Sequence, residues 1–203
     1  MNRRMSRAEA KIRTRELLLD AAALTFARKG FHGATVEEIA EAAGFTIGAL
    51  YANFGGKEQL FLELLSTRAS SQIAAAEEMV REGAVTATDP LRAISQYLVD
   101  LADKDADFAP LQAEFWLYAV RNPHVLDTMA EQMREPHAAL ARLITESVDT
   151  HGVPPDTVAT VVFALFQGLV RRRRVDPAST PPELFASALQ WLFTGIEHTE
   201  GTA

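Results

Sequence analysis

Donor side chains gather between residues 46 and 57 in a pattern suited to binding a phosphate backbone. Thr46, Tyr51, Asn53 and Lys57 offer two hydroxyls, an amide and an ammonium group. Such groups, together with helix N-termini, supply most contacts from proteins to DNA phosphates. Residues 46–49 are mostly small, so a helix that begins there can approach bases closely. The stretch therefore predicts a nucleic-acid contact.

Caps and glycines predict the two short helices that hold these donors. Thr35 and Glu38 have the spacing of a capping box, which starts a helix with Val36, Ile39, Ala40 and Ala43 as its apolar face. Gly44 suits the left-handed residue that ends this helix, and Thr46 can cap the next one. Gly55-Gly56 then interrupts the chain. Two short helices around a glycine turn make a helix-turn-helix.

Longer helices flank this module on both sides. The preceding apolar stripe starts at Ile12 and Leu19, continues through Phe26 and is followed by Gly30, a plausible stop. Lys57 begins the following helix, whose core face is Leu60, Phe61, Leu64 and Leu65. We predict a basic arm and DNA-binding domain over 1–57, linked by a helix over about 57–82 to a body over 83–203.

The motifs of this region resemble the DNA-binding domain of TetR (tetracycline repressor) family transcriptional regulators over about residues 10 to 65. The matching segments are Gly33–Ala40, Ala43–Tyr51 and Phe54–Leu60. The resemblance implies phosphate contacts from Thr35, Thr46, Tyr51 and Lys57, and base contacts from Ile47, Gly48 and Ala52. Ala52 stands where an aromatic side chain is common and Ile47 where a polar one is, which favours thymine methyl contacts and DNA shape over direct hydrogen bonding.

Plainer roles are open to several of these residues. Phe54 is expected to be a core aromatic, and Tyr51 could be one. Thr35 is expected to act first as a helix cap, with any phosphate contact secondary. The basic residues Arg3, Arg4 and Arg7 form either an ordinary solvated end or an arm for DNA.

Composition limits the classes that remain. The net charge is −7, yet residues 1–57 carry +3 and the rest −10, so a basic head precedes an acidic body. The 48% hydrophobic content suffices for a core. The chain has no cysteine, and we find no apolar run of bilayer length and no signal peptide. We expect a cytoplasmic protein without disulfides, cofactor, metal or membrane partner.

The apolar spacing predicts an all-α protein throughout, because it follows a period near 3.6 residues without sustained alternation. After the stretch 83–89, helices are predicted over roughly 90–104, 109–121, 123–151, 155–174 and 181–198. Pro136 lies inside the third of these and is expected to kink or divide it.

The body carries more apolar side chains than single helix faces can bury, which predicts a ligand cavity or an interface. The candidate ligand residues are Phe108, Leu111, Phe115, Trp116, Met129, Met133, His137, Phe163, Phe166 and Gln167, with Glu114 as another polar candidate. An ordinary core explains each one equally well. The resemblance adds weight to a small, largely apolar effector, since TetR-type bodies usually bind one.

The last two predicted helices are apolar around much of their circumference. Val158, Val161, Val162, Leu165, Phe166 and Leu169 recur in one, and Leu184, Phe185, Leu189, Trp191 and Phe193 in the other. By the resemblance they form a homodimer interface. The run 171–174 of four arginines is interpreted as a solvated helix C-terminus.

We therefore predict a sequence-specific DNA-binding transcriptional regulator, a repressor that a small, largely apolar effector releases from a palindromic double-stranded operator. Alternatives are an activator, or a helical ligand-binding or interaction protein that does not read DNA. An enzyme is disfavoured, because the chain has no Glu-x-x-His pair, P-loop, dinucleotide fingerprint or Gly-x-Ser-x-Gly, and its five histidines lack metal-ligand spacing.

Overall fold

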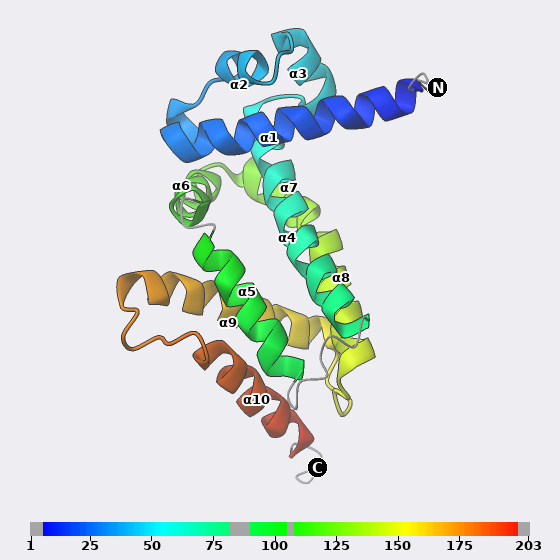
Figure 1. Cartoon of the computed structure of the whole chain (residues 1–203), viewed down its shortest axis with the longest axis vertical. Helices are drawn as coiled ribbons and strands as arrows, with labels where there is room; N and C mark the ends of the chain where they lie inside the picture. Colours follow the sequence, from blue (N-terminus) through cyan, green and yellow to red (C-terminus); the bar gives the residue numbers. More distant parts are fainter. Residues whose placement is uncertain (1–5, 82–89, 105–107, 199–203) are drawn as a thin grey trace. The chain divides into compact units, whose positions relative to one another are not determined.

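The structure, a computed structural model, describes residues 6–81, 90–104 and 108–198, and these are helical without strands. The helices follow the chain as α1 (Arg7–Gly33), α2 (Val36–Ala42), α3 (Ile47–Phe54), α4 (Lys57–Arg81), α5 (Pro90–Lys104), α6 (Phe108–Val120), α7 (Pro123–Gln132), α8 (Arg134–Ser147), α9 (Pro155–Val175) and α10 (Leu184–Glu197) (Figure 1). The predicted all-α fold is confirmed.

The helices pack into two compact units. Unit 1 comprises the described residues of Met1–Thr67 and Asp107–Gln132, and unit 2 those of Arg68–Ala106 and Met133–Ala203. The chain passes between them within α4, so this helix contributes its first turns to unit 1 and its later turns to unit 2. The functional domains predicted from the sequence, 1–57 and 83–203 with a linking helix, stay a prediction. The boundaries of the two packing units differ from those of the predicted domains, because α6 packs against α1.

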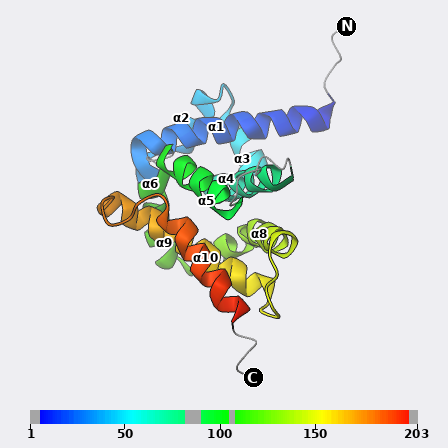
Figure 2. The same cartoon turned by 60° about the horizontal axis from the view of Figure 1, so that its bottom comes forward.

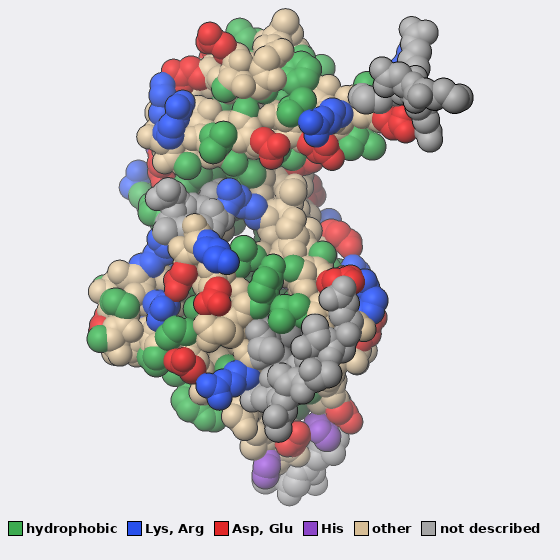
Figure 3. Space-filling model, viewed as in Figure 1, with side chains coloured by type: hydrophobic (Ala, Val, Ile, Leu, Met, Phe, Trp, Pro, Cys, Tyr) green, Lys and Arg blue, Asp and Glu red, His purple; other side chains and the backbone are tan. Residues whose placement is uncertain are grey.

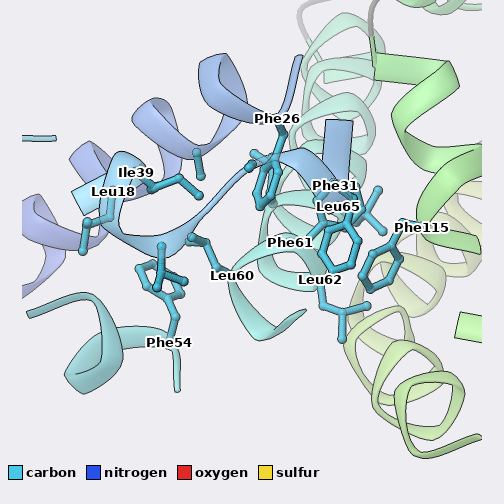
Figure 4. Packing of buried hydrophobic residues seen from close by; sticks show 14 of the residues in the cluster. Leu18, Phe26, Phe31, Ile39, Phe54, Leu60, Phe61, Leu62, Leu65 and Phe115 are labelled. Carbon is cyan, nitrogen blue, oxygen red and sulfur yellow. The ribbon is translucent and has the colours of Figure 1, made fainter. Parts of the chain in front are cut away.

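Unit 1 is built around a cluster of aromatic rings (Figure 4). Phe61 stacks on Phe115 with ring centroids 4.4 Å apart, and Phe31 meets Phe115 edge-on at 4.8 Å. Phe26 meets Phe61 edge-on at 5.1 Å. All four side chains are almost wholly buried. Offset and edge-on pairs add to the hydrophobic term and fix the rings in place, so α1, α4 and α6 share one dense core.

Gly30 breaks α1 without ending it, where the sequence predicted a stop. Its φ of 73° is left-handed, and a short last turn follows to Gly33. The carboxylate of Glu114 on α6 accepts the free N–H groups of that turn, from Phe31 at 3.0 Å and His32 at 2.9 Å. The left-handed φ disfavours a side chain at Gly30, and a Cβ there would lie 2.7 Å from Glu114 Oε2 and displace this carboxylate from its bonds.

Unit 2 is an arrangement of longer helices with two smaller cores. α8 packs against α9, and α10 lies against both α5 and α9 (Figure 2). One core joins Ala141, Ile144, Val158, Ala159 and Ile196, and the other joins Val99, Phe185 and Leu189. Only part of the apolar surface of α9 and of α10 is buried in these cores, as the sequence indicated.

Most predicted helix bounds agree with the structure to within a residue or two. The predicted helix over 123–151 is divided at Met133 into α7 and α8, and Pro136 lies buried in the first turn of α8, where a missing N–H donor costs little. The prediction that Pro136 kinks or divides this segment is confirmed. The last helix begins at Leu184, three residues later than expected, after the prolines at 181 and 182.

Candidate nucleic-acid interface and ligand cavity

The predicted capping box fixes the start of α2. Thr35 Oγ1 accepts the N–H of Glu38 at 3.3 Å, and Glu38 Oε2 accepts the N–H of Thr35 at 3.4 Å. Glu38 also pairs with Lys29 at 2.5 Å, and this hydrogen bond lowers the pKa of the Glu38 carboxyl. Thr35 thus acts as the helix cap that the sequence predicted.

The turn between α2 and α3 follows the predicted chemistry as well. Gly44 is left-handed with φ 75°, and Phe45 donates back to the carbonyl of Ala40 at 2.9 Å. Thr46 caps α3 by accepting the N–H of Ala49 at 3.2 Å. Gly55, with φ 71°, closes α3 as its left-handed cap. The turn and both caps hold α3 in a single orientation on α2.

One face of α3 is open to solvent, and it is the face the sequence assigned to DNA. Ile47 is 41% exposed and Tyr51 50%, and Gly48 and Ala52 are exposed beside them. Leu50 and Phe54 point the other way and are buried. The spacing of four residues between 47 and 51 and between 48 and 52 places them in one stripe. Phe54 is the core aromatic that the sequence predicted, and Tyr51 is not.

Arg15 of α1 anchors the C-terminal end of α3. Its guanidinium donates to the carbonyl of Asn53 and to Glu63, and lies 4.4 Å from the centre of the Phe54 ring. A cation at this end of a helix opposes the dipole and serves a carbonyl that has no partner within the helix. This role of Arg15 was not predicted from the sequence, because its partners lie 38 and 48 residues away along the chain and leave no local pattern.

Asn53 lies half-buried at the same end of α3. Its amide nitrogen donates to the carbonyl of Ala49 at 2.8 Å, while its Oδ1 has no partner among the described residues. A carbonyl oxygen is an acceptor, so a phosphate contact from Asn53 would use its amide nitrogen, which carries a second hydrogen beside the one donated to Ala49.

Lys57 is placed at the junction of α1 and α4. Its Nζ donates to the carbonyl of Ala34 at 3.0 Å and reaches that of His32 at 3.5 Å, and it lies 4.8 Å from the centre of the Phe31 ring. It is half-buried. The ammonium group thus satisfies carbonyls at the end of α1, and its predicted phosphate contact stays a prediction.

Basic side chains lie on unit 1 near both ends of α1 (Figure 3). The exposed ones on this helix are Arg7, Lys11, Arg13, Arg28 and Lys29. Arg3 and Arg4, the other members of the predicted arm, lie outside the described residues. Exposed cations on the unit that carries α3 favour an anionic polymer as partner.

A cluster of polar side chains lies in unit 1 where α4 begins. The phenol of Tyr118 donates to Glu58, and this bond raises the pKa of Tyr118. His124 Nε2 lies 3.8 Å from Glu58 Oε2, and the His32 and Tyr118 rings meet at 5.5 Å. These contacts join α1, α4, α6 and α7 within the unit.

Unit 2 contains a cavity of about 130 Å³ between α4, α5, α8, α9 and α10. The surface that it exposes is wholly apolar, although three of its lining residues, Gln72, Ser95 and Ser147, are of polar types. The lining residues are Ala69, Gln72, Ile73, Ala76, Ser95, Leu98, Leu140, Leu143, Ile144, Ser147, Val148, Val162, Phe163, Phe166, Phe185, Leu189 and Phe193. Such concave apolar sites are where small ligands bind.

Two of the predicted ligand residues, Phe163 and Phe166, line this cavity, and the other candidates with described side chains do not. Leu111 and Phe115 are buried in the core of unit 1, Met129 packs against that core, and Trp116 is 51% exposed. Glu114 caps the end of α1.

The remaining candidates are scattered. His137 contacts Thr160 Oγ1 at 3.0 Å, Met133 lies between α7 and α8, and Gln167 is half-buried. The side chain of Phe108 lies outside the described residues.

The part of the cavity wall that α4 contributes was not predicted from the sequence. Ala69, Gln72, Ile73 and Ala76 follow the spacing i, i+3, i+4, i+7, which marks one helix face. This stripe is visible in the sequence, but small residues made it inconspicuous. Ser95 was missed because a lone serine in a helix carries no pattern.

Part of the apolar surface of α9 and α10 stays exposed. Val161 is 38% and Phe163 37% exposed on α9, and Trp191 is 67% exposed on α10. These side chains belong to the two helices predicted to dimerise. Exposed large apolar groups on two helices that pack together favour a protein partner.

The arginine run at the end of α9 is less solvated than predicted. Arg173 donates to Asp103 at 3.1 Å and to the carbonyl of Thr180 at 2.9 Å, and Arg174 donates to the carbonyl of Ala102 at 3.3 Å. The run therefore joins α9 to the end of α5 and to the loop before α10, which single-helix reasoning could not anticipate.

No helix in the described ranges has the length and apolar character needed to span a bilayer. No three His, Cys, Asp or Glu side chains in the same ranges are grouped as metal ligands.

Two family models match the chain. The model described as bacterial regulatory proteins, tetR family, matches residues 18–64, and the model described as BetI-type transcriptional repressor, C-terminal, matches residues 87–197. Together they cover the helix-turn-helix and most of the body.

One curated relative and two solved structures are also similar to this chain over most of its length. The HTH-type transcriptional regulator YdgC of Bacillus subtilis is 26% identical over 193 residues, covering 91% of this chain and 93% of its own. The structure of the fatty acid degradation regulator FadR from Bacillus halodurans superposes with a TM-score of 0.63 at 20% identity, over 90% and 95% of the two chains. FadR from Bacillus subtilis in complex with stearoyl-CoA gives 0.59 at 18% identity, over 89% and 98%.

Proposed function

The chain belongs to the tetR family of bacterial regulatory proteins, with a BetI-type repressor C-terminal region, and from this premise we propose that it is a repressor released from a palindromic operator by a small, largely apolar effector. It is a DNA-binding transcriptional regulator. The observation that carries the proposal is the open stripe of α3, where Ile47 and Tyr51 stay exposed while the opposite face of the helix is buried.

In this proposal the stripe enters the major groove of the operator. Gly48 and Ala52 let the backbone approach, and Ile47 contacts thymine methyl groups. Tyr51, Thr46 and Thr35 contact phosphates, the last two without leaving their capping bonds, because a hydroxyl can accept one bond and donate another. Asn53 and Lys57 join them with their remaining N–H donors, since an amide nitrogen carries two hydrogens and an ammonium group three.

We propose that two copies associate through α9 and α10. The exposed Val161, Phe163 and Trp191 would be covered in a two-fold interface. Two-fold symmetry matches a palindromic operator with half-sites about one helical turn of DNA apart.

The cavity of unit 2 is the proposed effector site, and α4 is the proposed connection to DNA binding. Ile73 and Ala76 of this helix line the cavity, while Leu60 and Phe61 of the same helix belong to the core beneath α1. A ligand that favours another arrangement of α4 shifts the population of operator-competent molecules. A coupling of about 1–3 kcal/mol changes operator affinity about 5- to 150-fold. The FadR complex with stearoyl-CoA has this fold.

The experiment that tests this function is selection of bound duplexes from a random DNA pool at near-physiological salt. The expected result is an enriched palindrome whose binding weakens steeply as salt rises. Tyr51→Ala protein should enrich nothing while remaining dimeric by sedimentation. If the folded wild-type protein enriches no sequence, the proposed DNA-binding function is wrong, and the alternative of an interaction protein is favoured.

A further inference from the structure

The cavity of unit 2 presents hydrocarbon alone to whatever lies inside it. The surface that it exposes is wholly apolar, and none of its described lining residues is charged. Ser95 is 0% exposed and its hydroxyl oxygen is fully buried, so this hydroxyl lies behind the cavity surface and not in it. A molecule in the cavity therefore meets no hydrogen-bond donor or acceptor among the described residues.

Water is a poor occupant of such a space. A buried water molecule makes about three hydrogen bonds to protein, and apolar cavities that offer none stay dry. An empty cavity lowers stability in proportion to its volume, because the side chains around it lose packing contacts. The cavity of about 130 Å³ is thus kept at a cost that a ligand of the right chemistry would offset.

The same wall disfavours polar ligands. An ionised group placed among these side chains would lose its hydration without gaining a counter-ion. A neutral hydroxyl or carbonyl group would give up its hydrogen bonds to water and form none in return. Both penalties favour a ligand whose buried part is hydrocarbon throughout.

The volume and the shape of the wall restrict the size of that ligand. At about 130 Å³ the cavity is close to the roughly 150 Å³ of an engineered apolar cavity that accepts benzene. Phe163, Phe166, Phe185 and Phe193 contribute four rings to the wall. Such rings pack offset or edge-on against another ring and gain energy beyond the area that is buried. One six-membered hydrocarbon ring fits this space.

We propose that the cavity of unit 2 binds a neutral hydrocarbon about the size of one six-membered ring, with no hydrogen-bonding group inside the cavity. This proposal rests on the proposed function in taking the ligand as the effector, and it adds the chemical class. The ligand is selected by its fit and by exclusion: hydrocarbon gains from leaving water, whereas a polar competitor of the same shape loses its hydration.

Calorimetric titration of the full chain with three probes of similar shape tests this proposal. Toluene, benzyl alcohol and benzoate share a ring and differ in the polar group. We expect the wild-type protein to bind toluene at least about 5-fold more tightly than benzyl alcohol, because the buried hydroxyl finds no partner. Benzoate should bind at least about 100-fold more weakly than toluene.

Filling the cavity from α4 should abolish the binding of toluene. Ala76 lines the cavity and is 2% exposed, so Ala76→Leu places a larger apolar side chain in the space that the ligand would take. Ala74→Leu is the matched control, because Ala74 lies on the same helix, is exposed and does not line the cavity. It should bind toluene as the wild type does. Circular dichroism establishes that both variants are folded, and Ala69→Leu, at another lining position of α4, replaces Ala76→Leu if that variant is unfolded.

Three outcomes would overturn the proposal: no binding of toluene by the folded wild type, benzyl alcohol or benzoate bound as tightly as toluene, or undiminished toluene binding in the folded, filled variant. Because no DNA is present, these results are independent of operator selection. Toluene binding without an enriched operator contradicts the proposed function alone, and an enriched operator without toluene binding contradicts the hydrocarbon ligand alone.

Discussion

The two units of this protein solve opposite packing problems with similar residues. In unit 1, Phe26, Phe31, Phe61 and Phe115 interlock at centroid distances of 4.4 to 6.0 Å and belong to one continuous core. In unit 2, phenylalanines of α9 and α10 instead surround a cavity of about 130 Å³ between two smaller cores.

The contrast extends to polar groups. Unit 1 uses its inner polar side chains to fix positions: Glu114 holds the last turn of α1, and Arg15 holds the end of α3. In unit 2 the hydroxyl of Ser95 is left without a partner. The difference teaches that the helix proposed to read DNA is held by side-chain hydrogen bonds, whereas the region proposed to bind a ligand has a cavity and a buried hydroxyl without a partner.

The largest expected effect is on stability, from opening the dense core. Phe61→Ala should lower the free energy of unfolding by about 3–5 kcal/mol, because the vacated space cannot collapse among interlocked rings. Phe163→Ala, at the partly exposed wall of the existing cavity, should cost less than half as much. Urea unfolding of both variants measures the difference, and equal losses would erase the distinction between the units.

The next effect concerns DNA. Lys57→Gln should weaken operator binding about tenfold across sequences and reduce the slope of log affinity against log salt by about 1, as expected for one lost phosphate contact. Lys104→Gln, on an exposed residue at the end of α5, is the matched control and should change neither quantity. If the slope stays at its wild-type value, Lys57 makes no phosphate contact and only donates hydrogen bonds to the carbonyls of His32 and Ala34.

Arg15→Gln should have a smaller effect of another kind. The loss of its bonds to Asn53 and Glu63 should cost about 1 kcal/mol of stability and lower the preference for operator over random DNA, because α3 is less firmly held. The salt slope should not change, since no phosphate contact is removed. Urea unfolding measures the stability and competition binding the preference, with Arg142→Gln, an exposed residue of α8 paired with Glu135, as control. A reduced slope would instead make Arg15 a DNA contact.

Sequence patterns were reliable where the determinants are local. The capping box at Thr35, the left-handed Gly44 and the cap at Thr46 act within a few residues, and each lies in the structure as predicted. The exposed stripe of α3 followed from the same spacing.

Patterns were less reliable where the partner is distant in the chain. Phe115 and Leu111 looked like cavity residues because α6 is apolar on more than one face, yet the core of unit 1 takes them. Glu114 looked like a ligand contact, and its partners lie 82 and 83 residues away. Side-chain type alone does not distinguish the wall of a cavity from the inside of a core, because both are hydrocarbon.

The smallest predicted effect has the opposite sign and tests the unit 2 half of the comparison. Ser95→Ala should raise the free energy of unfolding of the ligand-free protein by about 1 kcal/mol, because it removes a buried hydroxyl that has no partner. Ser187→Ala removes a hydroxyl that is already bonded to Glu183, so it should be neutral or slightly destabilising. Thermal unfolding of the two variants side by side measures the sign. A residue kept at a cost to stability is one retained for something other than folding, so a destabilised Ser95→Ala protein would make Ser95 an ordinary structural residue.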